Sequence, residues 1–272
     1  MQETPMAAIP LSDQAMRDAA VATAEQLIAL MESTPDPEAP VPATSPWSIT
    51  DVFGHVAMEP GRYRDLALGE GTWPARATDL PAFNDAQIAA LPSRDIDDLA
   101  AILRWDLKQF IETLQGLAPQ ALMMFDGDQQ IRAGLSLGTL IGEFVVHGYD
   151  IGRATGRRWP IDPAHVPLVL AGMHQVMPGW VDADAVKHHK ATYRVHLRGG
   201  PSHTYRFEDG ALTIDPASTG PIDVHISAEP VTWLLLTYGR ANPIRAALTG
   251  KVLAYGRRPW LAPRLAKNFL PA

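Results

Sequence analysis

The sequence predicts two domains, a bundle of four α-helices followed by a small α+β domain. In the first half, four long segments repeat apolar residues every three or four positions, which is the period of an amphipathic helix. From Ala191 onward, apolar and polar residues alternate over short spans bounded by turn-forming residues, as in half-buried strands. A length of 272 residues also favours two domains. We place them at residues 1–180 and 191–272, joined by a linker.

The helices of the first half are expected at Ser12–Ser33, from Ser48 to about Leu68, at about Arg94–Leu117 and at Ser136–Ala154. Ser12 is placed to cap the first helix, and Ser48 forms a capping box with Asp51 at the start of the second. Pro60–Gly61 is expected to kink or interrupt that second helix. A further helix is expected at about Pro163–Pro178. Four amphipathic helices favour a bundle, in which each gives one apolar stripe to a shared interior.

Strands and short helices are expected in the second half. The expected strands lie within ATYRVHLRGG, HTYRFEDG, ALTIDP, IDVHISA and VLAYG, and the expected helices lie within PVTWLLLTYG, NPIRAALTG and RPWLAPRLAKNF. Glu208–Gly210 supplies a hairpin turn. Strands followed by helices predict a sheet that packs on helices.

Composition narrows the class of function. The formal net charge is -7, with no Lys/Arg block of the kind that binds nucleic acid, so no nucleic-acid partner is expected. No apolar run approaches the ~20 residues that span a bilayer, and the N-terminus lacks a secretory pattern. We therefore expect a cytoplasmic monomer or homodimer. The chain has no cysteine, so any thiol chemistry must use an external thiol.

The stretch GEFVVHGYDIGRATG puts polar residues into an apolar helical run. Glu143 and His147 are four residues apart, so both project from one helix face and can reach one metal ion. His55, on the apolar stripe of the second helix, is a candidate third ligand across the bundle. Two histidines and one glutamate would leave an open coordination position, as in catalytic zinc sites. On spacing alone, a partly exposed polar pair and a core histidine remain alternatives.

Two aspartates are assigned a supporting role beside these ligands. Asp150 follows His147 by three residues and can accept a hydrogen bond from its imidazole. The alternative is an ordinary solvated aspartate or one paired with Arg153. Asp51 is given the same supporting role beside His55.

At these residues the sequence resembles a known family. WSITDVFGHVA is similar to the W-T-x-x-D-x-x-x-H-L motif of mycothiol-dependent maleylpyruvate isomerases and their relatives, and GEFVVHGYDIGRATG resembles their E-x-x-x-H-x-x-D segment. The last 80 or so residues resemble the sterol-carrier-like domain that is often fused to that bundle. Two separated motifs in the right order, before the right second domain, make the resemblance fairly specific.

The resemblance implies a DinB-like four-helix bundle that holds a divalent metal, usually zinc. The ligands carried over are His55, Glu143 and His147. Mycothiol, the small-molecule thiol of the family, would bind the open position as a thiolate. This agrees with a chain that lacks cysteine, because a bound cation favours ionisation of an external thiol.

The reaction and the substrate stay open. An isomerase would add the thiolate to an activated double bond, allow rotation and release it, whereas an S-transferase would leave the thiol attached. A small electrophile with carboxylates, such as maleylpyruvate, would favour arginine clamps. The candidates are Arg62, Arg153, Arg257 and Arg258.

Two other functions are consistent with the sequence. The second domain could bind a lipid, with Trp233 to Leu236 and Tyr238 lining a tunnel, although such runs more often pack a core. We favour a covering role for this domain over the metal cleft. The third possibility is a metal-dependent hydrolase that uses water in the open position, with Glu59 or Asp150 as the base.

Overall fold

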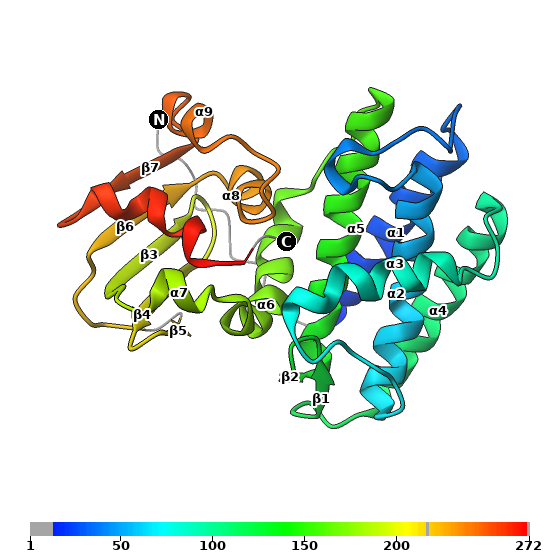
Figure 1. The fold of residues 1–272 in the computed structure, drawn as a ribbon, viewed down its shortest axis with the longest axis horizontal. Coiled ribbons are helices and arrows are strands. Elements are labelled where there is room, and N and C mark those ends of the chain that lie inside the picture. Colours follow the sequence, from blue (N-terminus) through cyan, green and yellow to red (C-terminus); the bar gives the residue numbers. More distant parts are fainter. Residues whose placement is uncertain (1–12, 216–217, 271–272) are drawn as a thin grey trace. The chain divides into compact units, whose positions relative to one another are not determined.

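Residues 13–215 and 218–270 are described by the computed structural model, and they fall into two units (Figure 1). The helical unit holds residues 13–161 and 171–175. The sheet unit holds residues 162–170 and the described residues from 176 onward. A helical part followed by a small α+β part confirms the predicted fold class.

Four long helices form the body of the helical unit, and they are labelled in Figure 1. They are α1 (Asp13–Glu32), α2 (Ile49–Leu68), α4 (Ile96–Gly116) and α5 (Ala133–Thr155). Helices α1 and α2 each pack against both α4 and α5, so every helix has two neighbours around a common interior. The cap predicted at Ser12 lies outside the described residues.

Helix α2 begins and ends as its sequence predicts, but it is not interrupted at Pro60. Ser48 and Asp51 form the predicted capping box, with the Ser48 side chain accepting from the Asp51 backbone N–H. The helix is continuous through Pro60, so the expectation of an interruption there is wrong. Proline removes one backbone hydrogen bond, but this turn is buried and tertiary packing holds it in place. The left-handed Gly69 ends the helix.

Smaller elements that the sequence pattern did not reveal complete the helical unit. They are α3 (Leu80–Ala89), β1 (Leu122–Phe125) and β2 (Gln129–Arg132), the last two forming an antiparallel hairpin. This hairpin leads directly into α5, which starts three residues before the predicted Ser136. Helix α5 is buried on most of its surface, which makes it the central helix of the unit.

The sheet unit contains a five-stranded mixed sheet. Its strands are β3 (Ala191–Leu197), β4 (Ser202–Glu208), β5 (Ala211–Asp215), β6 (Val224–Ala228) and β7 (Val252–Tyr255). The order is β5-β4-β3-β6-β7, antiparallel except where β3 runs parallel to β6. The turn between β4 and β5 is made by Asp209 and Gly210, both at positive φ, so the predicted hairpin is present.

The α-helices of this unit precede β3 or lie between β6 and β7 in the sequence. They are α6 (Val166–Val176), which continues into the helical unit, α7 (Ala183–Val186), α8 (Pro230–Thr237) and α9 (Pro243–Leu248). Short 3₁₀ helices lie at Pro42–Thr44, Ala77–Asp79, Pro163–His165, Met177–Trp180, Pro259–Arg264 and Ala266–Asn268. The helix expected in RPWLAPRLAKNF is therefore two 3₁₀ turns, because Pro263 removes a backbone donor in its middle.

Within the described residues, no helix combines the length and the apolar character that crossing a bilayer requires.

Candidate metal centre

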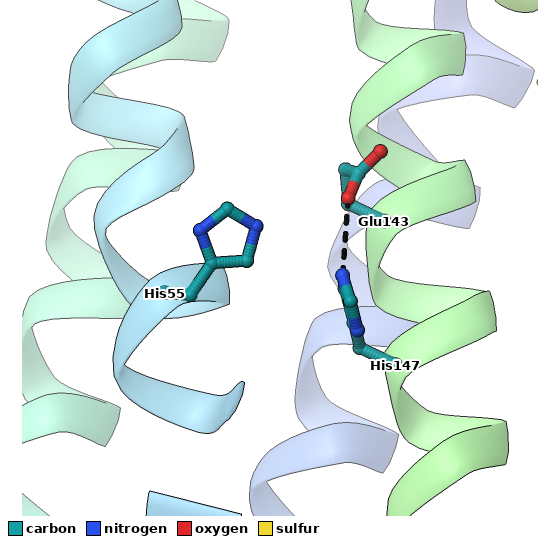
Figure 2. A group of neighbouring side chains, drawn as sticks. All are labelled: His55, Glu143 and His147. Carbon is teal, nitrogen blue, oxygen red and sulfur yellow. Dashed lines mark ion pairs between the residues drawn. The ribbon is translucent and has the colours of Figure 1, made fainter. Parts of the chain in front are cut away.

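Helices α2 and α5 bring three potential metal ligands together inside the bundle. His55 projects from α2 toward Glu143 and His147, which lie one turn apart on α5 (Figure 2). One ligand atom from each residue lies within 4.8 Å of the others. Nε2 of His147 is 3.3 Å from Oε2 of Glu143, and the two imidazole rings are 5.4 Å apart and nearly perpendicular. His55, which lies 88 residues before Glu143 in the sequence, thus faces the same point as Glu143 and His147.

Burial of these side chains is uneven. Both histidines are buried, whereas the Glu143 side chain is 24% exposed. Glu143 is therefore the least buried of the three ligands.

Each histidine directs its Nδ1 toward a buried carboxylate. Nδ1 of His55 is 3.9 Å from Oε1 of Glu59, and Nδ1 of His147 is 4.0 Å from Oδ2 of Asp150. Both Nδ1 atoms are buried and lack a hydrogen-bond partner among the described residues. Metal-bound histidines usually have a carboxylate or carbonyl on the second ring nitrogen. The arrangement fits that pattern loosely, at distances longer than a hydrogen bond.

The protonation states suit metal binding at neutral pH. Burial, together with the nearby His147 and Arg62, lowers the pKa of His55 to about 3. Burial tends to raise the pKa of Glu143, but the hydrogen bond from His147 and the surrounding positive charges outweigh it and the pKa is lowered. A neutral imidazole and an ionised carboxylate are the forms that bind a divalent cation.

A buried ionic cluster lies beside the ligands. Arg62 pairs with Glu59, 3.2 Å from Nη1 to Oε2, and with Asp126 at the end of β1. Its side chain is only 9% exposed, and its guanidinium lies 5.0 Å from the ring centre of Phe83. Burial raises the pKa of Glu59 to about 7, with Arg62 opposing the shift. Two carboxylates thus engage Arg62 in this structure, and its role as a substrate contact stays a prediction.

The remaining predicted residues lie elsewhere. Asp51 stays in the cap of α2, where it accepts from the Ser48 backbone and pairs with Arg94 at 2.6 Å. Arg153 is exposed near the end of α5, with its guanidinium 5.9 Å from the Tyr149 ring. Arg257 and Arg258 belong to the sheet unit and are taken up below.

Three residues near the ligands were missed from sequence. Tyr63 is buried on α2. Because His55, Glu59 and Tyr63 have the four-residue spacing of one helix face, the sequence pattern could have indicated Tyr63. Asp126 follows a short strand and reaches Arg62 across 64 residues, which no local pattern reveals. Trp47, just before the helix cap, places its ring 5.3 Å from that of His55.

Comparisons with known proteins agree with this architecture. Residues 14–152 match the family model described as the mycothiol maleylpyruvate isomerase N-terminal domain, and residues 175–256 match the SCP-2 sterol transfer family. A comparison with curated proteins finds no match.

Two solved structures share the fold of the whole chain. A crystal structure of the mycothiol-dependent maleylpyruvate isomerase is 15% identical, with a TM-score of 0.53, and a histidine-to-alanine variant of it is 14% identical, with a TM-score of 0.55. Each covers 93% of this chain and 95% of the other. The family match spans half of this chain and confirms the resemblance seen in the motifs. The chain belongs to the mycothiol maleylpyruvate isomerase family.

Proposed function

We propose that this chain is a metal- and mycothiol-dependent isomerase or S-transferase that acts on a small electrophile. The supporting observation is the grouping of His55, Glu143 and His147 inside the bundle of a chain of this family. These residues would hold one divalent metal, zinc by the chemistry of the donor set. When bound, the metal would favour the thiolate form of an incoming thiol near neutral pH.

The side chains around the ligands have defined tasks in this proposal. Asp150 and Glu59 lie 4.0 and 3.9 Å from Nδ1 of His147 and His55, and a small side-chain movement would let them accept the Nδ1 protons and leave the opposite ring nitrogen for the metal. Glu143 supplies the negative charge and the solvent-facing side of the group. The electrophile would enter from that side.

The external thiol carries the covalent step because the chain has no cysteine. In an isomerisation, its sulfur would bond to one carbon of an activated double bond, the remaining single bond would rotate, and the thiol would leave. In a transfer, the carbon–sulfur bond would persist and the leaving group would depart with its electron pair. The second outcome consumes the thiol, and the first regenerates it.

Elemental analysis and two histidine variants test the metal assignment. We expect about one zinc per chain in protein purified without chelator, and loss of that zinc in His147→Ala. His174→Ala, on α6 and outside the ligand group, serves as the matched control and should keep its zinc. Wild-type protein free of any metal after reconstitution with zinc would rule the assignment out.

The reaction is tested separately with mycothiol and maleylpyruvate. Product formation that regenerates mycothiol identifies an isomerase, and consumption of mycothiol with a range of electrophiles identifies a transferase. Activity should fall by about 100-fold or more in His147→Ala, since loss of a supporting residue alone costs 10- to 100-fold. Full activity of the wild type without any thiol would contradict the proposal.

One observation favours a hydrolase as the second candidate. Glu59 is buried 3.9 Å from His55 with a pKa raised to about 7, which is the range of a general base. Such an enzyme would hydrolyse its substrate without added thiol and lose activity in Glu59→Gln. The lipid-carrier hypothesis is not favoured by the sheet-unit cavity of about 460 Å³, whose lining is mainly charged and polar.

A further inference from the structure

A cavity lies wholly within the sheet unit, and none of its lining residues is a proposed metal ligand. Its volume is about 460 Å³, within the range of small-molecule sites. Arg257, Arg258 and Arg264 line it from the segment that follows β7, and His188, His189 and Asp223 line it from elsewhere in the unit. The three arginines come after residue 256, where the match to the SCP-2 family ends. The cavity is therefore built partly from sequence that the family match does not include.

Hydrogen bonds fix two of the guanidinium groups at the cavity wall. Nη1 of Arg258 donates to the Lys190 carbonyl at 3.2 Å, and Nη2 of Arg264 donates to the Ala185 carbonyl at 3.3 Å. A guanidinium has five N–H donors, so these bonds orient each group and leave further donors for a ligand. Arginines held in this way suit planar oxyanions, which accept two parallel hydrogen bonds.

The charge of the cavity is positive. Asp223 is the carboxylate among its lining residues, and it pairs with Arg257 and lies 3.8 Å from Arg258. Its other oxygen accepts from the Thr192 backbone at 3.0 Å. One buried carboxylate thus faces the guanidiniums of Arg257 and Arg258, and Arg264 and Lys190 add further positive charge to the lining. The positive field reaches the neighbouring His189, whose pKa is lowered by burial and by Arg264 and Arg258.

A buried histidine offers a further polar group. Nε2 of His189 is 2.9 Å from the Tyr193 hydroxyl, and that hydroxyl donates to the Leu261 carbonyl at 3.4 Å. Nε2 of the neutral ring can donate to that hydroxyl or accept from it, depending on the tautomer. The cavity therefore combines cationic donors with a buried imidazole.

We infer that this cavity binds a small organic oxyanion carrying a carboxylate or phosphate group. Arg258 and Arg264 supply the oriented donors, Arg257 adds charge at the rim, and the imidazole of His189 is a further polar contact for the same ligand. Leu261 is the single aliphatic side chain in the lining, so the cavity offers a lipid tail little apolar surface. The inference goes beyond the proposed function, since it needs neither metal nor thiol.

Calorimetric titration of the full chain tests the inference with two probes, citrate for carboxylates and inorganic pyrophosphate for phosphates, at constant ionic strength. At least one should bind saturably at one site per chain, and the tighter probe identifies the anion class. Arg258→Gln and Arg264→Gln should each weaken binding about tenfold or more, which is about 1.4 kcal/mol. Arg245→Gln, an exposed arginine of α9, should bind as the wild type does.

Three outcomes would overturn the inference: no saturable binding of either probe, equal weakening in Arg245→Gln, or unchanged binding in both cavity variants. Each would indicate that anions meet only diffuse surface charge. The titrations are repeated after chelator treatment and dialysis, and binding should be unchanged. A failure here leaves the metal proposal intact, and a metal-free bundle leaves this cavity intact.

Discussion

His55 and Glu59 lie one turn apart on α2, and the bundle interior moves their pKa values in opposite directions. The pKa of His55 falls to about 3 and that of Glu59 rises to about 7. The main cause is the same, because burial disfavours the charged form of either group. Near pH 6 both residues are therefore largely neutral, with Glu143 as the ionised group beside them.

These shifts give folding stability a pH dependence whose sign can be worked out. An acid with a raised pKa binds more protons in the folded state between its unfolded and folded values, so it loses its stabilising effect as pH rises from about 4.5 to 7. His55 acts oppositely between about 3 and 6.5. The two contributions to the free energy of unfolding partly cancel in the wild-type protein, so a variant is needed to separate them.

Glu59→Gln should remove the Glu59 contribution and leave that of His55. Its unfolding free energy relative to wild type should increase by on the order of 1 kcal/mol per pH unit between pH 4.5 and 7, and level off above pH 7. Urea unfolding of chelator-treated protein at several pH values measures this difference. A difference that stays constant over the whole range would show that Glu59 keeps its ordinary pKa in the folded state.

Replacing Arg62 should be costly because it leaves two buried carboxylates without their cation. Arg62→Met is expected to lower the free energy of unfolding by about 3–5 kcal/mol. The matched control is Arg64→Met, two residues along α2, whose pairs with Asp65 and Asp106 are more exposed and worth about 1 kcal/mol or less. Denaturant unfolding compares them, and equal costs would contradict the importance assigned to the buried cluster.

At the scale of elements, α5 is the helix that carries two of the proposed metal ligands, Glu143 and His147, together with Asp150. Gly148, directly after His147, faces Trp159, and a Cβ there would lie 2.2 Å from Cζ2 of that ring. Gly152, one turn later, would bring a Cβ to 3.0 Å from the Cβ of Trp159. The two glycines allow the segment after α5 to fold back against the helix.

Gly148→Ala is therefore expected to destabilise the helical unit by about 1–3 kcal/mol, because a well-packed interior must shift to accept the methyl group. Gly134→Ala, in the first turn of the same helix, meets no atom within 4 Å and should instead stabilise by about 0.5–1 kcal/mol. Thermal or urea unfolding distinguishes the two. Destabilisation of similar size in both variants would mean that α5 tolerates alanine at neither glycine. Packing against Trp159 would then not explain the cost of Gly148→Ala.

Most long elements were predictable from the sequence, and the exceptions have physical reasons. Capping residues and apolar period locate α2, whereas Pro60 suggested a break that tertiary packing prevents. The hairpin β1–β2 was missed because its strands, LMMF and QQIR, do not alternate apolar and polar residues. Parallel pairing of β3 with β6 was also beyond reach, since strand order depends on contacts between distant segments.

The candidate site shows the same division. The four-residue spacing of Glu143 and His147 could be read locally, and the family motifs suggested His55. Asp126 and its pair with Arg62 could not, because a turn residue after a short strand carries no periodic signal. The cavity of the sheet unit was also hidden, since a net charge of -7 over the chain conceals a local cluster of arginines.

At the scale of the whole molecule, the two units have separate interiors, and the three proposed ligands all belong to the helical unit. A ligand that binds only the folded state stabilises the unit that holds it, by about 4 kcal/mol at a thousand times its dissociation constant. Separate units often unfold in separate transitions. Metal removal is therefore expected to act on one transition and leave the other in place.

Scanning calorimetry of the full chain with zinc and with chelator measures this effect. We expect two transitions, of which only one moves to lower temperature on chelation. In His147→Ala, that transition should lie at the lower temperature both with zinc and with chelator. Hydrogen exchange assigns the transition, since peptides from α2 and α5 should exchange faster without metal while those from β3 and β6 should not. Equal shifts of both transitions would mean that the units unfold as one, and the absence of any shift would mean that the helical unit binds no zinc.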